Sequence, residues 1–235
     1  MPPLRRTQLT MSDGTLLMTE VVSDEDSNLC LYLLMHEMLK DGDMVVGFDI
    51  EWGFRQSRSM SRSKSDAGRL AEQEKSSTGS DRHSKRVEHH IALLSFCTKL
   101  GCILLRLRPE SISPSLQRFL SIKDILFVGV HIKEDLEMMR SRYGLVVRNA
   151  VDLSDFAAKV YDQPRFAAYT ARELSAKVSS LKFDPKPSTV LWSNWYDQNL
   201  SAEQIESATI DAYATYKVGK KLMESGSSSM KRLFS

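Results

Sequence analysis

Residues 44–52 read Met-Val-Val-Gly-Phe-Asp-Ile-Glu-Trp and place two carboxylates, Asp49 and Glu51, inside an otherwise apolar run. A short run of this kind is typical of a central strand that is buried on both faces of a sheet. Side chains two positions apart leave a strand on the same face, so Asp49 and Glu51 should lie side by side, on the face that also holds Gly47. Because two buried acids repel each other and lose their hydration, we expect a cation beside them, and a metal ion is the simplest one.

The patterns in the rest of the chain predict an α/β fold in which a mixed sheet is flanked by helices. Further strands or extended stretches are expected at residues 19–22, 91–97, 102–107, 125–130 and 151–153. Helices are expected at about residues 25–40, after Pro114, at about residues 132–143, and from capping-box signatures at Thr170 and Ser201, the last running to about residue 223.

The chain of 235 residues is expected to fold as one domain over residues 19–224. Residues 1–18 are interpreted as a flexible lead-in, and residues 225–235 as a flexible tail. Residues from about 55 to 90 are rich in Ser, Arg and Lys and contain few large apolar side chains, which predicts a disordered surface insertion between two strands. The basic start of this insertion could contact phosphates, or the whole segment could be a solvated linker.

Composition narrows the classes of function. The three cysteines form neither a disulfide scaffold nor a zinc-binding spacing; they are Cys30, Cys97 and Cys102. No apolar run approaches the roughly 20 residues that cross a bilayer, and the first residues lack the core of a secretory signal. We therefore expect no membrane partner and an intracellular location, nuclear or cytoplasmic. A net charge of +2 gives no general affinity for nucleic acid, so any basic surface must be local.

Two further carboxylates lie where a solvated acid is not expected. Asp135 follows Ile132 by three residues, on the helix stripe that should face the sheet. Asp211 stands among small residues that would let its helix approach a strand closely. These small residues are Ala208, Ala212 and Ala214.

Four carboxylates from three segments can meet only if the fold brings them together; they are Asp49, Glu51, Asp135 and Asp211. Ligand sets made only of oxygen suit Mg²⁺ or Mn²⁺, and two such ions about 3.5 to 4 Å apart stabilise the attacking and leaving oxygens of phosphodiester hydrolysis. The alternative for each acid is a salt bridge or a helix cap. The four together favour a nuclease.

Three stretches form an ordered set of motifs. Residues 41–52 end in Phe-Asp-Ile-Glu-Trp, residues 128–135 read Val-Gly-Val-His-Ile-Lys-Glu-Asp, and Ser193-Asn194-Trp195 precedes residues 200–214, which contain Asp-Ala-Tyr at 211–213. This set resembles the DEDD 3′-5′ exonucleases, most closely the exonuclease domain of the Werner syndrome protein and its plant relatives. The likeness covers roughly residues 19–224 apart from the insertion. An Asp-x-Glu motif alone is weak evidence for this family, whereas the ordered set of three motifs is specific evidence for it.

The resemblance implies an RNase H-like fold with a five-stranded mixed sheet. It also implies a 3′-5′ exonuclease that acts on single-stranded or 3′-end DNA or RNA with two Mg²⁺ or Mn²⁺ ions. In that family pattern Asp49 would bridge both ions, Glu51 and Asp211 would complete the first site, and Asp135 would hold the second. These four residues would be catalytic residues and metal ligands at once.

One position departs from the family pattern. The residue four before the last aspartate is usually a tyrosine that orients the attacking water, and a sister branch uses a histidine five before it. This chain has Ser207 and Glu206 there. Losing a positioned acid-base group costs on the order of 10² to 10⁴ in rate. Two outcomes stay open, a slow exonuclease or a catalytically weak relative that binds nucleic acid or protein. If only the water-orienting group is missing, Ser207→Tyr should raise turnover.

Three ring side chains near the motifs have two interpretations each. His131 could approach the acidic site, or simply begin a helix. Trp192 and Trp195 could stack on bases, or pack against the last helix.

Overall fold

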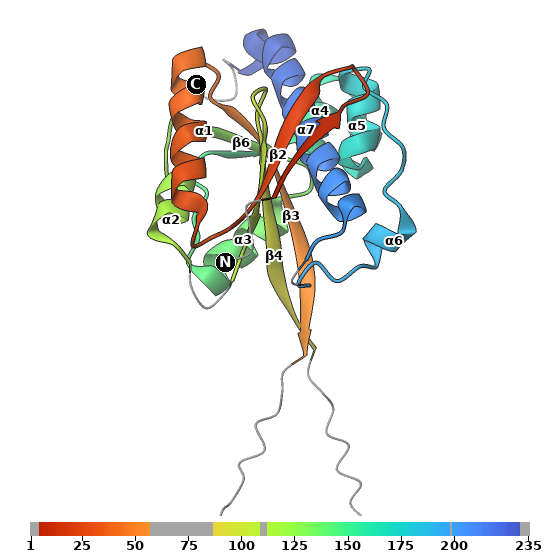
Figure 1. The fold of residues 1–235 in the computed structure, drawn as a ribbon. Helices are drawn as coiled ribbons and strands as arrows, with labels where there is room; N and C mark the ends of the chain where they lie inside the picture. Colours follow the sequence, from red (N-terminus) through yellow and green to blue (C-terminus); the bar gives the residue numbers. More distant parts are fainter. Residues whose placement is uncertain (1–4, 57–86, 109–111, 198, 231–235) are drawn as a thin grey trace, which may run out of the picture.

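A mixed sheet runs through the computed structural model, which describes residues 5–56, 87–108, 112–197 and 199–230 (Figure 1). Counted over those residues, its seven strands lie in the order β1-β2-β5-β4-β3-β6-β7. The strands are β1 (Arg5–Thr10), β2 (Leu16–Ser23), β3 (Val45–Gln56), β4 (Val87–Cys97), β5 (Cys102–Arg106), β6 (Leu126–Gly129) and β7 (Ala150–Asp152). β3 pairs antiparallel with β4 and parallel with β6, which makes the sheet mixed.

Helices cover both faces of this sheet (Figure 1). One face packs against α1 (Ser27–Asp41), α2 (Pro114–Leu120) and α3 (Lys133–Tyr143). The other face packs against α4 (Leu153–Val160), α5 (Ala171–Val178) and α7 (Ala202–Met230). A 3-10 helix (Pro164–Ala168) follows α4, and α6 (Ser188–Leu191) precedes α7. The predicted α/β fold with a mixed sheet flanked by helices is confirmed.

The sheet has more strands than predicted. The sequence predicts five strands and a flexible lead-in over residues 1–18, and the lead-in is wrong from Arg5 onward. β1 pairs antiparallel with β2 at the edge of the sheet. An exposed edge strand buries little surface, so the polar run Arg-Arg-Thr-Gln that opens β1 carries no apolar alternation that would reveal a strand.

Two other predicted segments fall largely or partly outside the described residues. β3 extends to Gln56 and β4 begins at Val87, and the rest of the predicted insertion, residues 57–86, lies outside the description. In the predicted tail, α7 continues to Met230, and residues 231–235 lie outside it. The helix passes the predicted end even though residues 224–230 include Gly226 and four serines, which favour a helix less than alanine does. Among the described helices, none is long and apolar enough to cross a bilayer.

Gly47 determines how closely α7 approaches β3. A Cβ atom added to Gly47 would lie 2.3 Å from the carbonyl oxygen of Ala212 and 2.7 Å from the backbone nitrogen of Tyr216. Both atoms belong to the backbone of α7, so the helix would have to move to make room. The predicted close approach of this helix to a strand is confirmed, and it sets the position of Asp211 relative to Asp49.

Gly47→Ala is expected to lower the free energy of unfolding by about 1 to 3 kcal/mol, because the added methyl group overpacks a helix-to-strand contact made of backbone atoms. Urea denaturation measures this change. Gly219→Ala on the same helix is the comparison: its added Cβ would lie 2.7 Å from Cγ2 of the buried Val128, and the gain of about 1 kcal/mol that alanine brings to a helix offsets part of that overpacking, so a smaller loss is expected. Unfolding midpoints that are equal for wild type and Gly47→Ala would contradict the prediction.

Candidate metal centre

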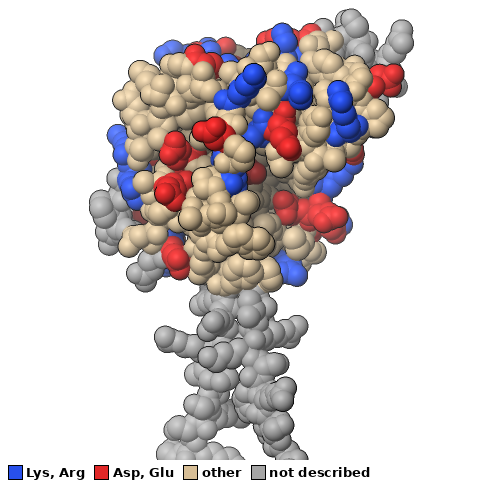
Figure 2. Space-filling model, turned by 90° about the vertical axis from the view of Figure 1, so that its right-hand side faces the viewer, with Lys and Arg blue, Asp and Glu red and all other residues tan. Residues whose placement is uncertain are grey.

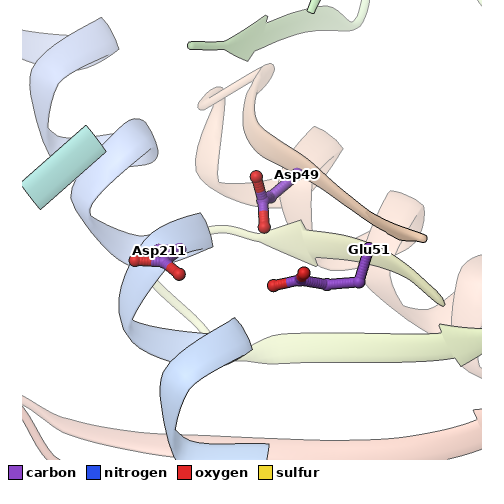
Figure 3. A group of neighbouring side chains, drawn as sticks. All are labelled: Asp49, Glu51 and Asp211. Atoms are coloured by element: carbon purple, nitrogen blue, oxygen red, sulfur yellow. The ribbon is translucent and has the colours of Figure 1, made fainter. Parts of the chain in front are cut away.

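Three of the four predicted carboxylates meet where β3 faces α7 (Figure 3). Asp49 and Glu51 leave β3 on the same face and point toward the turn of α7 that carries Asp211. One carboxylate oxygen from each of the three residues lies within 4.8 Å of the other two. This spacing allows three carboxylates to share a divalent cation.

Among the described residues Asp135 does not belong to this group, although its charge acts on Asp49. It comes from the first turn of α3, and its Oδ1 accepts a hydrogen bond from Nε1 of Trp52 at 3.0 Å. Trp52 directly follows Glu51 on β3. The indole therefore ties the fourth carboxylate to the strand that carries the first two.

Burial and mutual repulsion disfavour the ionised forms of these acids. Burial, followed by the charges of Glu51 and Asp211, raises the pKa of Asp49 well above its usual range, and Asp135 adds to this rise. Burial raises the pKa of Glu51 to about 7, although the neighbouring Lys186 acts in the opposite direction. Burial also raises the pKa of Asp135. The cluster therefore favours the arrival of positive charge.

Two cationic side chains reach the same carboxylates. Lys186, from the loop between α5 and α6, forms ion pairs with Glu51 and Asp211, and its Nζ lies 3.3 Å from Oδ2 of Asp211. Arg172 of α5 donates a hydrogen bond from Nε to Oδ1 of Asp211 at 2.6 Å. The centre therefore holds two cations of its own next to its acids.

The side chains at this centre fit a hard divalent cation. The candidate ligand atoms are all carboxylate oxygens, which suit Mg²⁺ or Mn²⁺ better than softer metals. Burial raises the pKa values of Asp49 and Glu51 even though Lys186 acts in the opposite direction, so both carboxylates favour a neutralising charge. A divalent ion would supply that charge.

A family model described as 3′-5′ exonuclease matches residues 78–226 of the chain. The chain belongs to this 3′-5′ exonuclease family. The matched residues include Asp135 and Asp211, whereas Asp49 and Glu51 precede them.

One relative and two solved structures illustrate what the chain is similar to. RISC-interacting clearing 3′-5′ exoribonuclease 1 of Arabidopsis thaliana is 31% identical over 144 residues, which cover 60% of this chain and 70% of the relative. Escherichia coli RNase D matches with a TM-score of 0.61 at 16% identity, over 89% of this chain and 45% of that chain. The EXO domain of Aedes aegypti Nibbler matches with a TM-score of 0.57 at 14% identity, over 94% of this chain and 93% of that chain.

These likenesses confirm the predicted RNase H-like fold. This chain spans less than half of the RNase D chain, so the likeness covers one part of that protein. The predicted closeness to Werner-type exonuclease domains stays a prediction.

Position 207, where the family resemblance places a water-orienting tyrosine, is occupied by a serine that is bound to an arginine. Ser207 is only 3% exposed, and its Oγ accepts a hydrogen bond from Nη2 of Arg172 at 2.7 Å. The same guanidinium contacts Asp211 through Nε. Arg172 therefore occupies the space beside Asp211 that a larger side chain at position 207 would need. Glu206 is exposed and does not replace the missing group.

The structure places the ring side chains of His131, Trp192 and Trp195 in different surroundings. His131 is exposed and has a φ of 58°, and its Nε2 lies 2.9 Å from the carbonyl oxygen of Ala167 in the 3-10 helix, so it contacts that helix. Trp195 is 3% exposed and packs with α7 in the core, as predicted. Trp192 is 87% exposed, so packing against the last helix, one of its two interpretations, is wrong. Its place at the end of the four-residue α6 leaves the indole without a neighbouring apolar face.

Sequence patterns missed three side chains of the centre. Lys186 has no periodic pattern around it, but it stands between Pro185 and Pro187, and two prolines around one charged residue indicate a rigid loop. Arg172 lies on the buried side of α5, where a charge is as unexpected as Asp135 is on its own helix. Trp52 stood inside the first motif, although its hydrogen bond to Asp135 depends on the tertiary fold.

Proposed function

We propose that this chain removes nucleotides from the 3′ end of RNA by hydrolysing the terminal phosphodiester bond. Two divalent ions, Mg²⁺ or Mn²⁺, would be held by the predicted ligands, namely Asp49, Glu51, Asp135 and Asp211. The observation that carries the proposal is the meeting of three carboxylates from β3 and α7 within 4.8 Å in a chain of the 3′-5′ exonuclease family. The preference for RNA rests on the Arabidopsis relative, which is named an exoribonuclease.

The protein's part in this reaction is to hold the ligands rigidly. Asp49 and Glu51 stand on a central strand, and Asp211 stands on a helix that packs directly against it, so their separation is fixed by the core. Trp52 orients the carboxylate of Asp135 through its indole N–H. When bound, divalent ions would activate water and offset the charge that develops on the phosphate.

On the side of the molecule that Figure 2 shows, substrate binding has to rely on local contacts. Figure 2 shows the side of the molecule that lies on the right in Figure 1, where Lys and Arg side chains are interspersed with Asp and Glu. A continuous basic surface would attract any polyanion, whereas a mixed surface favours contacts at defined places. The exposed indole of Trp192 is one such place, because aromatic side chains stack on bases of any sequence.

Incubating a 5′-labelled single-stranded RNA with the protein and Mn²⁺ tests the proposal. We expect a ladder of shortened labelled products that disappears when EDTA removes the metal, and slower shortening of DNA of the same sequence. A circular form of the same RNA is the matched control, because it lacks a 3′ end and should stay intact. An RNA that remains full length in Mn²⁺, or a ladder that persists in EDTA, would contradict the proposed activity.

The second candidate function is an RNA-binding protein without significant turnover. It is favoured by Ser207, whose hydroxyl is held by Arg172 and cannot orient a water molecule as a tyrosine would. In that case fluorescence anisotropy would show binding of the same RNA in Mn²⁺, while the gel shows no shortening.

A further inference from the structure

Lys186 lies inside the acidic cluster. Its Nζ contacts carboxylate oxygens of both Glu51 and Asp211, two of the three residues that could share a metal ion. The side chain is only 20% exposed, so this ammonium group is removed from most of the solvent. It occupies the side of the cluster where Glu51 and Asp211 face each other.

The loop that carries Lys186 is held in place. Pro185 and Pro187 restrict the backbone on either side of Lys186. Arg172 donates from Nη1 to the carbonyl oxygen of Asp184 at 2.6 Å. The same guanidinium is bound to Asp211, so one side chain fixes both the loop and a cluster carboxylate.

The ammonium group also has a fixed support on its other side. Nζ of Lys186 lies 5.2 Å from the centroid of the Trp195 ring, and Trp195 is itself buried in the core. A cation over an indole face is stabilised by the ring electrons. Rigid loop, arginine anchor and indole together present the ammonium group to the carboxylates, whereas a long surface lysine would sample many conformations.

We propose that Lys186 holds one of the two ion positions in the resting protein, so that the second divalent ion binds only by displacing its ammonium group. This inference rests on the proposed function for the identity of the ions. One ion would bind tightly on the side of Asp49 and Asp135, neither of which is ion-paired to Lys186. Completion of the site would then depend on the concentration of the divalent ion.

Lys186→Met tests the proposal, because methionine keeps a long apolar chain and removes the charge. Free Mn²⁺ is counted by electron paramagnetic resonance during a titration without substrate. Wild type should bind one Mn²⁺ tightly and a second weakly, whereas Lys186→Met should bind the second about tenfold or more tightly than wild type does, since a competing positive charge has been removed. Lys182→Met, at an exposed position in the same loop, is the matched control and should titrate like wild type. Equal titrations for Lys186→Met and wild type would overturn the proposal.

A second experiment keeps Lys186 in place, so it tests the proposal even if the Lys186→Met protein does not fold. Mg²⁺ is titrated into wild type and into Trp195→Phe while tryptophan fluorescence is recorded. The difference between the two fluorescence signals is the contribution of Trp195. This contribution should change only in the second, weaker binding step, when the ammonium group leaves the Trp195 ring. A change of this contribution during the first, tight step would overturn the proposal.

The two proposals can fail separately because neither titration uses RNA. A 3′-end ladder together with equal Mn²⁺ titrations removes only the role of Lys186. The expected titrations without a ladder remove only the nuclease activity.

Discussion

Asp49→Asn is expected to lower the rate of 3′-end hydrolysis by about 10³-fold or more while leaving the metal-free protein as stable as wild type or more stable. Asparagine keeps the shape of the side chain but offers no anionic oxygen to a cation. Burial and the charges of Glu51 and Asp211 raise the pKa of Asp49, so removing its charge relieves repulsion in the absence of metal. The rate is measured on labelled RNA at saturating Mn²⁺, and the stability by thermal unfolding in EDTA.

The opposite signs of these two effects separate a role in catalysis from a role in folding. A residue needed only for the fold would lose activity and stability together. Glu206→Gln is the matched control, because it also removes an acid, from an exposed position on α7 next to Ser207. It should leave both quantities unchanged. If Asp49→Asn keeps wild-type turnover, the assignment of Asp49 to the metal centre is wrong.

The sequence predicted those parts of the centre that lie on regular elements. On a strand, alternation places Asp49 and Glu51 on one face, and the structure shows them there. The small side chains around Asp211 predicted a close helix, and Gly47 shows how close it is. Such patterns are local, so they can be recognised in the sequence without knowledge of the tertiary fold.

The remaining parts of the centre depend on contacts between distant segments. Lys186 meets Glu51 across 135 positions of sequence, and Arg172 meets Asp211 across 39. No periodicity connects a loop lysine with a strand, so the pairing of these two cations with Glu51 and Asp211 could not be predicted. The exposure of Trp192 was missed for a similar reason: an aromatic residue beside a motif suggests packing, and only the short α6 shows that no neighbour covers it.

A tyrosine at position 207 is expected to raise turnover only when Arg172 is removed as well. In wild type, Ser207 is buried and bound to Arg172, whose guanidinium also contacts Asp211 and Asp184. Ser207→Tyr alone would have to displace that guanidinium, so it should lower the free energy of unfolding by about 1 to 3 kcal/mol without accelerating the reaction. The structure thereby changes the expectation from sequence that this substitution alone raises turnover.

Combining Arg172→Ala with Ser207→Tyr should make room for the ring beside Asp211. Relative to Arg172→Ala alone, the double variant is expected to gain about 10²-fold in turnover, the lower end of what a positioned acid-base group contributes. Arg172→Ala with Ser207→Phe is the matched control, because it fills the same space without a hydroxyl group and should show no gain. Turnover on labelled RNA at saturating Mn²⁺ measures all four combinations of the double-mutant cycle. If Ser207→Tyr alone is faster than wild type, Arg172 does not block this position. If the tyrosine and phenylalanine double variants have equal rates, a hydroxyl group at this position does not orient the water.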